Sequence, residues 1–185
     1  MTSRFPNPRV TGEVFTAHEE RGWWPGGPTD PNPTENGVTQ AAYDHWRAGH
    51  GLPSQSVQLM TPAEQTAIYD GFWVACAGDL VARASSALAI CHFDAAFNAG
   101  APQAAKLLQR SAGLLPAQQD GVLGPLSWNA VTAAVLASED AMVGAYLQNR
   151  WSFLQRLANF EHWKGVWGGR ENRLAFLCGS SWRTS

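Results

Sequence analysis

Two neighbouring carboxylates, Glu19 and Glu20, close a short amphipathic run and stand directly before Arg21, a glycine and two tryptophans. The run from Thr11 predicts a helix, and Gly22 supplies the left-handed residue that commonly ends one. The negative end of a helix dipole and apolar indole walls both raise the pKa of a carboxyl group. A carboxylic acid that keeps its proton near neutral pH can protonate the leaving oxygen of a glycoside. The alternative is a solvated glutamate pair, and the residues alone do not choose between Glu19 and Glu20.

A loop rich in proline and glycine, residues 25–33, follows the tryptophans and leads to Thr34. Its four prolines exclude a helix, and Asp30 within it is a candidate second carboxylate. Asn36-Gly37 is a strong turn signal, which predicts a small hairpin with Val38-Thr39 on its return strand. Positions that can do chemistry therefore gather between residues 19 and 39.

The remainder of the chain must position these residues, and its pattern is mostly helical. Residues 1–10 indicate a loose arm, and strands are nearly absent outside the hairpin. Helix signals cover residues 40–48, a segment starting at Pro62, the small-residue run 81–98, residues 102–112 and 125–137, a segment after Ser138, and a final short helix in a glycine-broken tail over 163–177. Asp120 and the glycines that follow it predict a structural loop. The fold class is mainly α.

Composition narrows the function classes. The chain has 185 residues, 45% of them hydrophobic and 15% charged, with a net charge of −2. This weak charge gives no basic field for nucleic acid or an anionic membrane, and no apolar run reaches membrane-spanning length. Nine tryptophans are the unusual feature, and flat indole faces suit sugar rings as well as cores. The N-terminus lacks the apolar region of a signal peptide, so we expect synthesis in the cytoplasm.

Neither cysteine nor histidine spacing indicates a metal or cofactor. Cys76, Cys91 and Cys178 are widely separated, and an odd count argues against a disulfide framework, although one bridge remains open. The five histidines form no known metal-binding motif. Asp30-Pro31-Asn32-Pro33-Thr34 is only loosely similar to a calcium loop. We assign neither metal nor cofactor.

Taken in order, the motifs resemble the glycoside hydrolase family 108 lysozymes with a C-terminal peptidoglycan-binding region. The family's Glu-Gly-Gly-Tyr and later Gly-Ile-Thr are similar to Glu20-Arg21-Gly22-Trp23 and Gly37-Val38-Thr39. Further similar segments are His92 to Gly100, Ala104 to Arg110, Asp120 to Ser127, and Trp167-Gly168-Gly169-Arg170. The resemblance spans nearly the whole chain in the family's order. It implies a lysozyme-like helical fold with a small β-hairpin near the active site, residues 1–97 as the catalytic part and residues 98–185 as the binding part of one compact unit.

Two departures from the family concern the site. Arg21 replaces the first glycine of the opening motif. The family's aspartate nine residues after the glutamate falls on Thr29, with Asp30 beside it, so a one-residue loop shift would let Asp30 take that role.

The resemblance implies an N-acetylmuramidase that cleaves the MurNAc-β-1,4-GlcNAc bond of peptidoglycan strands. It selects Glu20 as general acid and implies that Thr34 orients the attacking water, with Asp30 as a second carboxylate. Trp23, Trp24 and Tyr43 are candidate sugar platforms, at least one of which we expect in the core. We expect a monomer that reaches the wall by release through a pore, as a phage endolysin does.

Asn98 is a candidate substrate contact whose alternative role, with Asp94, is to brace a helix junction. Two rival functions stay open: a lytic transglycosylase, and a catalytically silent wall-binding module.

Overall fold

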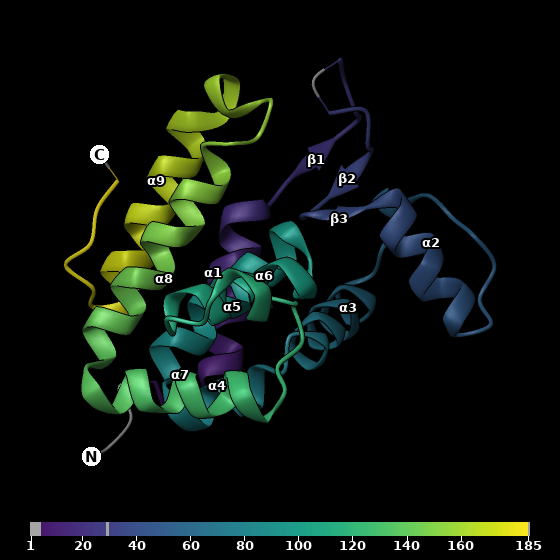
Figure 1. The fold of residues 1–185 in the computed structure, drawn as a ribbon. Helices are drawn as coiled ribbons and strands as arrows, with labels where there is room; N and C mark the ends of the chain where they lie inside the picture. The colour runs from purple at the N-terminus through teal and green to yellow at the C-terminus, as the bar shows by residue number, and fades with distance from the viewer. Residues whose placement is uncertain (1–4, 29, 185) are drawn as a thin grey trace. The chain divides into compact units, whose positions relative to one another are not determined.

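The computed structural model describes residues 5–28 and 30–184, and its fold is mainly helical with one small sheet, which confirms the predicted fold class (Figure 1). The chain forms two compact units: a small unit of residues 14–71, and a large unit that combines the residues before Val14 with those from Phe72 onward. Of the predicted N-terminal arm, residues 1–4 lie outside the described part of the chain, as does Thr29 in the loop.

The small unit holds the end of α1 (Pro8–Glu20), a three-stranded antiparallel sheet, and two helices that follow it. The sheet has the order β1 (Trp23–Trp24), β2 (Thr34–Glu35) and β3 (Val38–Thr39), with Trp24 opposite Thr34 and Glu35 opposite Val38. The chain then enters α2 (Gln40–Gly49), the short 3-10 helix η1 (Val57–Leu59) and α3 (Pro62–Ala75), whose last residues belong to the large unit.

The predicted hairpin is confirmed, and its turn chemistry explains it. Asn36 and Gly37 both have left-handed backbone angles, φ +48° and +76°, as the tight connection between β2 and β3 requires. The two α-helices that follow the hairpin begin at hydroxyl caps. The Thr39 hydroxyl accepts the Ala42 N–H at 3.2 Å, and the Thr61 hydroxyl accepts the Glu64 N–H at 3.2 Å.

The large unit is an all-helical assembly within the described residues (Figure 1). It contains α4 (Gly78–Ala84), α5 (Ser86–Ala99), α6 (Ala101–Ser111), the 3-10 helix η2 (Pro116–Gln118), α7 (Pro125–Ala137), α8 (Glu139–Leu154) and α9 (Phe160–Cys178). Helix α5 is central: residues 87–97 are buried on every face, and α4, α6, α8 and α9 pack against it. The small residues of α5 permit this close approach.

Three predicted helix boundaries are wrong, each for a local reason. Helix α1 begins at Pro8 rather than Thr11, because the Asn7 side chain accepts the Val10 N–H at 3.2 Å and proline suits the first helical position. The predicted 81–98 helix breaks at Ser85, whose hydroxyl caps α5 by accepting the Leu88 N–H at 2.9 Å.

The third error is the tail, which is one continuous helix, α9, despite three internal glycines. Burial favours this helix over its local propensity. One face of α9 is buried in the large unit, and this face includes Gly168, Leu174, Ala175 and Cys178. Tertiary packing of that face stabilises the helix even though glycine has a low helix propensity.

The Asp120 loop has the structural role that the sequence predicted. Asp120 Oδ1 accepts hydrogen bonds from Gln109 Nε2 at 2.7 Å and from the Val122 N–H at 2.9 Å, while Gly121 has φ +83°. The hydrogen bond from Gln109 holds the pKa of Asp120 below its usual value. The side chain of Gln109 is completely buried and also reaches the Ser127 hydroxyl at 2.9 Å, so this amide closes the loop onto α6 and α7.

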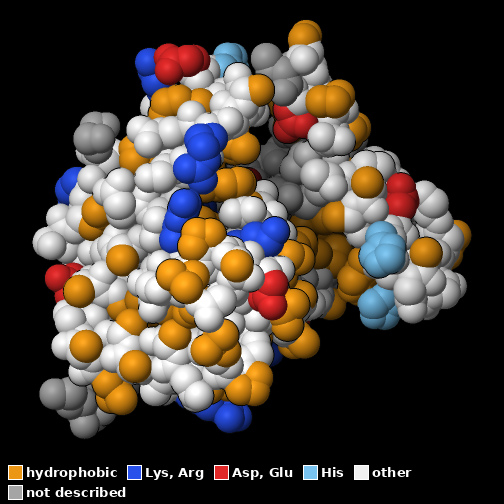
Figure 2. All heavy atoms as spheres, in the orientation of Figure 1, with side chains coloured by type: hydrophobic (Ala, Val, Ile, Leu, Met, Phe, Trp, Pro, Cys, Tyr) orange, Lys and Arg blue, Asp and Glu red, His pale blue; other side chains and the backbone are white. Residues whose placement is uncertain are grey.

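Charged side chains are sparse on the face of the molecule in Figure 2, as the low charged content implies. Small patches of Lys and Arg or of Asp and Glu are separated by hydrophobic and uncharged side chains. Among the described residues, no helix is long and apolar enough to cross a membrane.

Candidate active site

A pocket of about 260 Å³ lies where α1 ends against the sheet of the small unit. We call it the Glu20 pocket, and its lining residues come from one stretch of sequence: Glu19, Glu20, Arg21, Gly22, Trp23, Trp24, Asp30, Thr34 and Gly37. The structure thus brings together five of the predicted site residues, with Glu20 at the last position of α1.

Hydrogen bonds between the helix exit and the hairpin turn fix the position of Glu20. The Gly22 N–H donates to Asn36 Oδ1, and the Asn36 N–H donates to the Gly22 carbonyl, both at 3.0 Å. Asn36 is itself held from α3, because its Nδ2 donates to Gln65 Oε1 at 3.1 Å and its carbonyl accepts the Tyr69 hydroxyl at 3.0 Å. The left-handed φ of Gly22, +111°, lets the chain turn from helix to strand at once.

Asn36 and Gln65 hold the backbone beside the Glu20 pocket, a positioning role that the sequence did not reveal. Asn36 was identified only as half of a turn signal, whereas its side chain joins α1, the hairpin and α3. The only available clue was that asparagine tolerates the left-handed region and carries both a donor and an acceptor.

The two glutamates differ in their surroundings. The Glu19 side chain is only 7% exposed, and one of its oxygens lies 3.6 Å from His18 Nδ1. Glu20 is half-buried and lines the pocket, one residue before the chain leaves the helix. Arg21, which replaces the family's glycine, is exposed, and its Nη2 lies 3.2 Å from His18 Nε2. Both glutamates line the pocket, but consecutive helical residues differ by about 100° in direction, so their side chains leave α1 on different sides.

Asp30 and Thr34 are both tied to Asn32 in the loop between β1 and β2. Asp30 Oδ1 accepts the Asn32 N–H at 3.2 Å and Asn32 Nδ2 at 2.9 Å. The Thr34 hydroxyl donates to the Asn32 carbonyl at 2.9 Å. This leaves the hydroxyl oxygen of Thr34 as an acceptor, and it leaves Asp30 with a second carboxylate oxygen.

The tryptophans of β1 are the exposed aromatic surface of the site. Trp23 is 39% exposed and Trp24 is 38% exposed, unusually high values for such large apolar side chains. Trp24 Nε1 donates to the Asp30 carbonyl at 3.0 Å, and a Cβ on Gly27 would lie 3.0 Å from the Trp24 ring. One face of Trp24 therefore packs against the loop, whereas no hydrogen bond joins the Trp23 side chain to the loop among the described residues.

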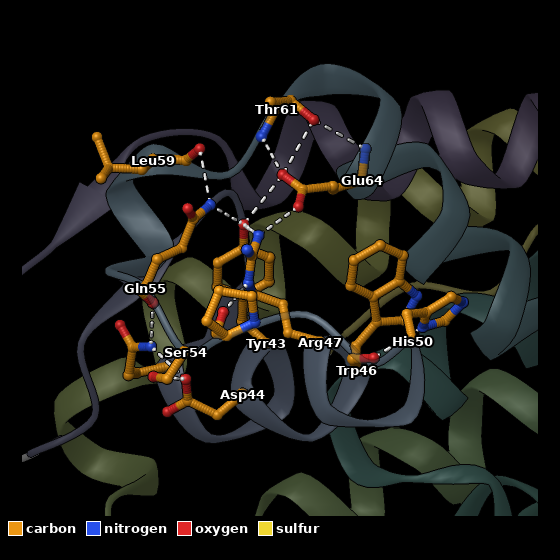
Figure 3. Close-up of polar contacts among 12 residues, drawn as sticks. Tyr43, Asp44, Trp46, Arg47, His50, Ser54, Gln55, Leu59, Thr61 and Glu64 are labelled. Atoms are coloured by element: carbon orange, nitrogen blue, oxygen red, sulfur yellow. Dashed lines mark hydrogen bonds and ion pairs between the residues drawn. The ribbon is translucent and has the colours of Figure 1, made fainter.

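Tyr43 lies in the core of the small unit, where no sugar ring can stack on it. Its side chain is fully buried, and its hydroxyl donates to Glu64 Oε2 at 2.9 Å and accepts from Arg47 Nη1 at 3.0 Å (Figure 3). The Arg47 guanidinium also contacts Glu64 Oε1 at 2.6 Å, so the group joins α2 to α3. Trp46 stacks on Tyr43 from the same helix, with the rings 6.4 Å apart.

Glu64 in this group is a structural carboxylate. Its oxygens accept the Thr61 N–H at 2.8 Å and the Tyr43 hydroxyl, and the hydrogen bond from Thr61 is the main reason why the pKa of Glu64 lies below its usual value (Figure 3). A lowered pKa favours the ionised form of Glu64, whereas a general acid must hold its proton.

Asn98 is placed near the end of α5 in the large unit, where its amide oxygen accepts Arg150 Nη2 at 3.0 Å. This interaction braces a buried ion cluster: Arg150 contacts Asp94 at 2.7 Å and Glu171 at 3.0 Å, and Arg170 contacts Asp94 at 2.6 Å. Burial raises the pKa of Glu171 to about 7. The bracing alternative for Asp94 and Asn98 is the one this geometry favours.

Within residues 5–28 and 30–184, no group of three or more His, Cys, Asp or Glu side chains has an arrangement that would hold a metal ion. The described residues that line the Glu20 pocket include three carboxyl groups, the Thr34 hydroxyl and two indoles.

Comparison with known proteins agrees with this arrangement. Residues 14–100 match the family model described as glycosyl hydrolase 108, and residues 103–183 match the one described as predicted peptidoglycan domain. The fold is similar to the structure of Brucella abortus SagA, with a TM-score of 0.76, 26% sequence identity, and coverage of 96% of this chain and 97% of that chain. No curated protein matches the sequence. The two family matches together span nearly the whole chain and confirm the resemblance: residues 14–100 belong to the glycosyl hydrolase 108 family, and residues 103–183 are a predicted peptidoglycan domain.

Proposed function

We propose that this glycoside hydrolase is an N-acetylmuramidase that cleaves the β-1,4 bond between N-acetylmuramic acid and N-acetylglucosamine in peptidoglycan. Glu20 donates a proton to the glycosidic oxygen, and water attacks the anomeric carbon of the oxocarbenium-like transition state. The observation that carries the proposal is the convergence of Glu20, Asp30, Thr34 and two exposed indoles on one pocket, inside the region that matches the hydrolase family.

The surroundings of Asp30 and Thr34 support different roles for the two residues toward the attacking water. One oxygen of Asp30 is occupied by Asn32, so its second oxygen is the one that would take a proton from the attacking water. The Thr34 hydroxyl has given its hydrogen to Asn32, so its oxygen can only accept a hydrogen bond from that water. Trp23 and Trp24 offer the flat apolar faces on which neighbouring sugar rings would stack.

The test compares Glu20→Gln with Glu19→Gln on purified peptidoglycan sacculi. Both substitutions remove one carboxylate at the same helix end and keep the side-chain shape, so Glu19→Gln is the matched control. General acid catalysis contributes about 10²–10⁴-fold, so Glu20→Gln should lose at least about 100-fold of the rate of glycan release. The Glu19→Gln protein should keep most of it. Full activity of Glu20→Gln would show that the acid is elsewhere.

A lytic transglycosylase is the second candidate, because a Thr34 hydroxyl committed to Asn32 is also compatible with a site that positions no water. Mass spectrometry of the released fragments separates the two candidates. Reducing N-acetylmuramic acid ends identify hydrolysis, and 1,6-anhydro ends identify the transglycosylase. Binding of the wild-type protein to sacculi without release of any fragment would instead indicate a wall-binding module.

A further inference from the structure

Two of the three cysteines meet in the core of the large unit. Cys91 lies in the middle of α5 and Cys178 is the last residue of α9, yet their Sγ atoms are 3.4 Å apart. Cys91 is completely buried and Cys178 is 7% exposed. Two thiols in contact across a helix interface need only a small closing movement to reach the length of an S–S bond, about 2.05 Å.

The two thiols are linked by consecutive hydrogen bonds. Cys91 Sγ donates to Cys178 Sγ, and Cys178 Sγ donates to the Ala87 carbonyl at 3.5 Å, one turn earlier on α5. Cys76 differs, because its thiol donates to the Trp73 carbonyl at 3.4 Å within its own chain segment. Cys76 is therefore an internal control: it is a third buried thiol in the same unit, and its hydrogen bond goes to a backbone carbonyl rather than to another thiol.

The position of Cys178 at the end of a helix makes its thiol accessible to an oxidant when that end opens. Helix α9 ends at this residue, where Gly179 has φ +73° and its N–H bonds to the Phe176 carbonyl at 3.1 Å. The last turn of a helix opens more readily than its middle. Opening of this turn exposes Cys178, whereas Cys91 is enclosed in the most buried helix of the unit.

We propose that Cys91 and Cys178 form an intramolecular disulfide, by thiol–disulfide exchange with a small or protein disulfide, that ties the end of α9 to the centre of α5. The Cys178 thiolate attacks the oxidant disulfide, forms a mixed disulfide and releases one thiol. The Cys91 thiolate then attacks the Cys178 sulfur, forms the Cys91–Cys178 bond and releases the second thiol. Both cysteines give up their protons to the released thiolates, and the two electrons pass to the oxidant. This inference does not depend on the proposed hydrolase activity.

The environment of Cys91 makes the second step the slow one. The hydrogen bond to Cys178 and burial both hold the pKa of the Cys91 thiol well above its usual value, so little thiolate forms until the helix end opens. The expected behaviour is slow but complete oxidation, with the oxidised protein resistant to mild reductant because its sulfurs are buried again.

The test incubates the folded wild-type protein with oxidised glutathione, blocks remaining thiols with iodoacetamide, and maps tryptic peptides without reduction. The three cysteines fall in separate peptides, residues 48–83, 84–106 and 174–183, so the pairing is read directly. We expect peptide 84–106 linked to peptide 174–183, with Cys76 alkylated. A link involving Cys76, three alkylated cysteines, or a lasting glutathione adduct on Cys178 would each overturn the proposal.

Variants give a second, independent measurement. Cys76→Ser should still form the link, whereas Cys91→Ala should accumulate a glutathione adduct on Cys178 and no link. The bond closes a loop of about 90 residues, so the oxidised wild type should melt on the order of 10 °C above the reduced protein. Excess strong reductant, added while the protein is unfolded, should remove this difference in wild type and Cys76→Ser after refolding, and have no effect on the melting of Cys91→Ala. An equal shift in Cys91→Ala would also overturn the proposal.

Discussion

Substitution of Asn36 should separate the stability of the small unit from the placement of Glu20. The Asn36 side chain accepts the Gly22 N–H through Oδ1 and donates to Gln65 through Nδ2, and its backbone is left-handed at φ +48°. Three substitutions remove these features in turn. Asn36→Asp keeps the acceptor and tolerates the backbone angle, Asn36→Gly keeps only the backbone freedom, and Asn36→Ala keeps neither.

The expected losses of unfolding free energy follow from these contacts. Asn36→Asp loses one donated hydrogen bond, a cost of about 0.5–1.5 kcal/mol. Asn36→Gly loses both side-chain hydrogen bonds, which together contribute about 1–3 kcal/mol. Asn36→Ala also forces a β-carbon into the left-handed region, and after allowance for the greater chain entropy of glycine this adds about 1 kcal/mol.

Urea denaturation measures these losses, and amide hydrogen exchange at Gly22 reports whether the Gly22 N–H is still bonded to the side chain at position 36. Because Gly22 follows Glu20 by two residues, glycan release should survive in Asn36→Asp and fall in Asn36→Gly and Asn36→Ala. The reasoning is refuted if Asn36→Asp exchanges its Gly22 amide as fast as Asn36→Ala does, since the carboxylate oxygen would then not replace the amide oxygen.

Three further outcomes are expected. Burial lowers the pKa of His92 to about 4 from an ordinary 6.5, so the unfolded state binds more protons between these two pH values. The free energy of unfolding should therefore fall by about 3 kcal/mol as the pH drops from 6.5 to 4. Urea denaturation at several pH values measures this slope, and His92→Asn should flatten it. The lowered pKa of Glu64 stabilises the fold above pH 4.5, and that contribution is lost as the pH falls through the folded pKa, so Glu64→Gln should make acid unfolding less steep below pH 4.5. Trp23→Ala should weaken sacculus binding with little change in melting temperature, whereas Trp24→Phe should lower the melting temperature because it removes the hydrogen bond to the Asp30 carbonyl; equal effects on melting would contradict the assigned roles.

The sequence could predict the features that local chemistry decides. Asn36-Gly37 forces its turn, Thr61 with Glu64 forms a capping box, and Pro125 begins α7, so these elements lie where they were expected. The lining of the Glu20 pocket is of the same kind, because it comes from residues 19–37, although the hold of Gln65 and Tyr69 on Asn36 depends on α3.

The features that distant contacts decide could not be predicted in this way. The glycines of α9 predict a break, but burial of one face of the helix, with Leu174, Ala175 and Cys178 on it, stabilises it. Tyr43 has the residue type of a sugar platform, but an arginine and a glutamate from two helices hold its hydroxyl in the core. The meeting of Cys91 with Cys178 depends on how α9 packs on α5, for which the spacing of the cysteines carries no signal.

The buried ion cluster has a consequence for the modular description of this chain. Asp94 lies in the region that matches the hydrolase family, whereas its partners Arg150 and Arg170 lie in the region that matches the peptidoglycan domain. A cut between residues 100 and 103 would separate α5, which carries Asp94, from Arg150 and Arg170, and breaking a buried ion pair by removing one partner is strongly destabilising. The boundary between the two sequence families is therefore not a boundary at which the protein can be divided, and exchange of one C-terminal region for another between relatives would have to carry α5 with it.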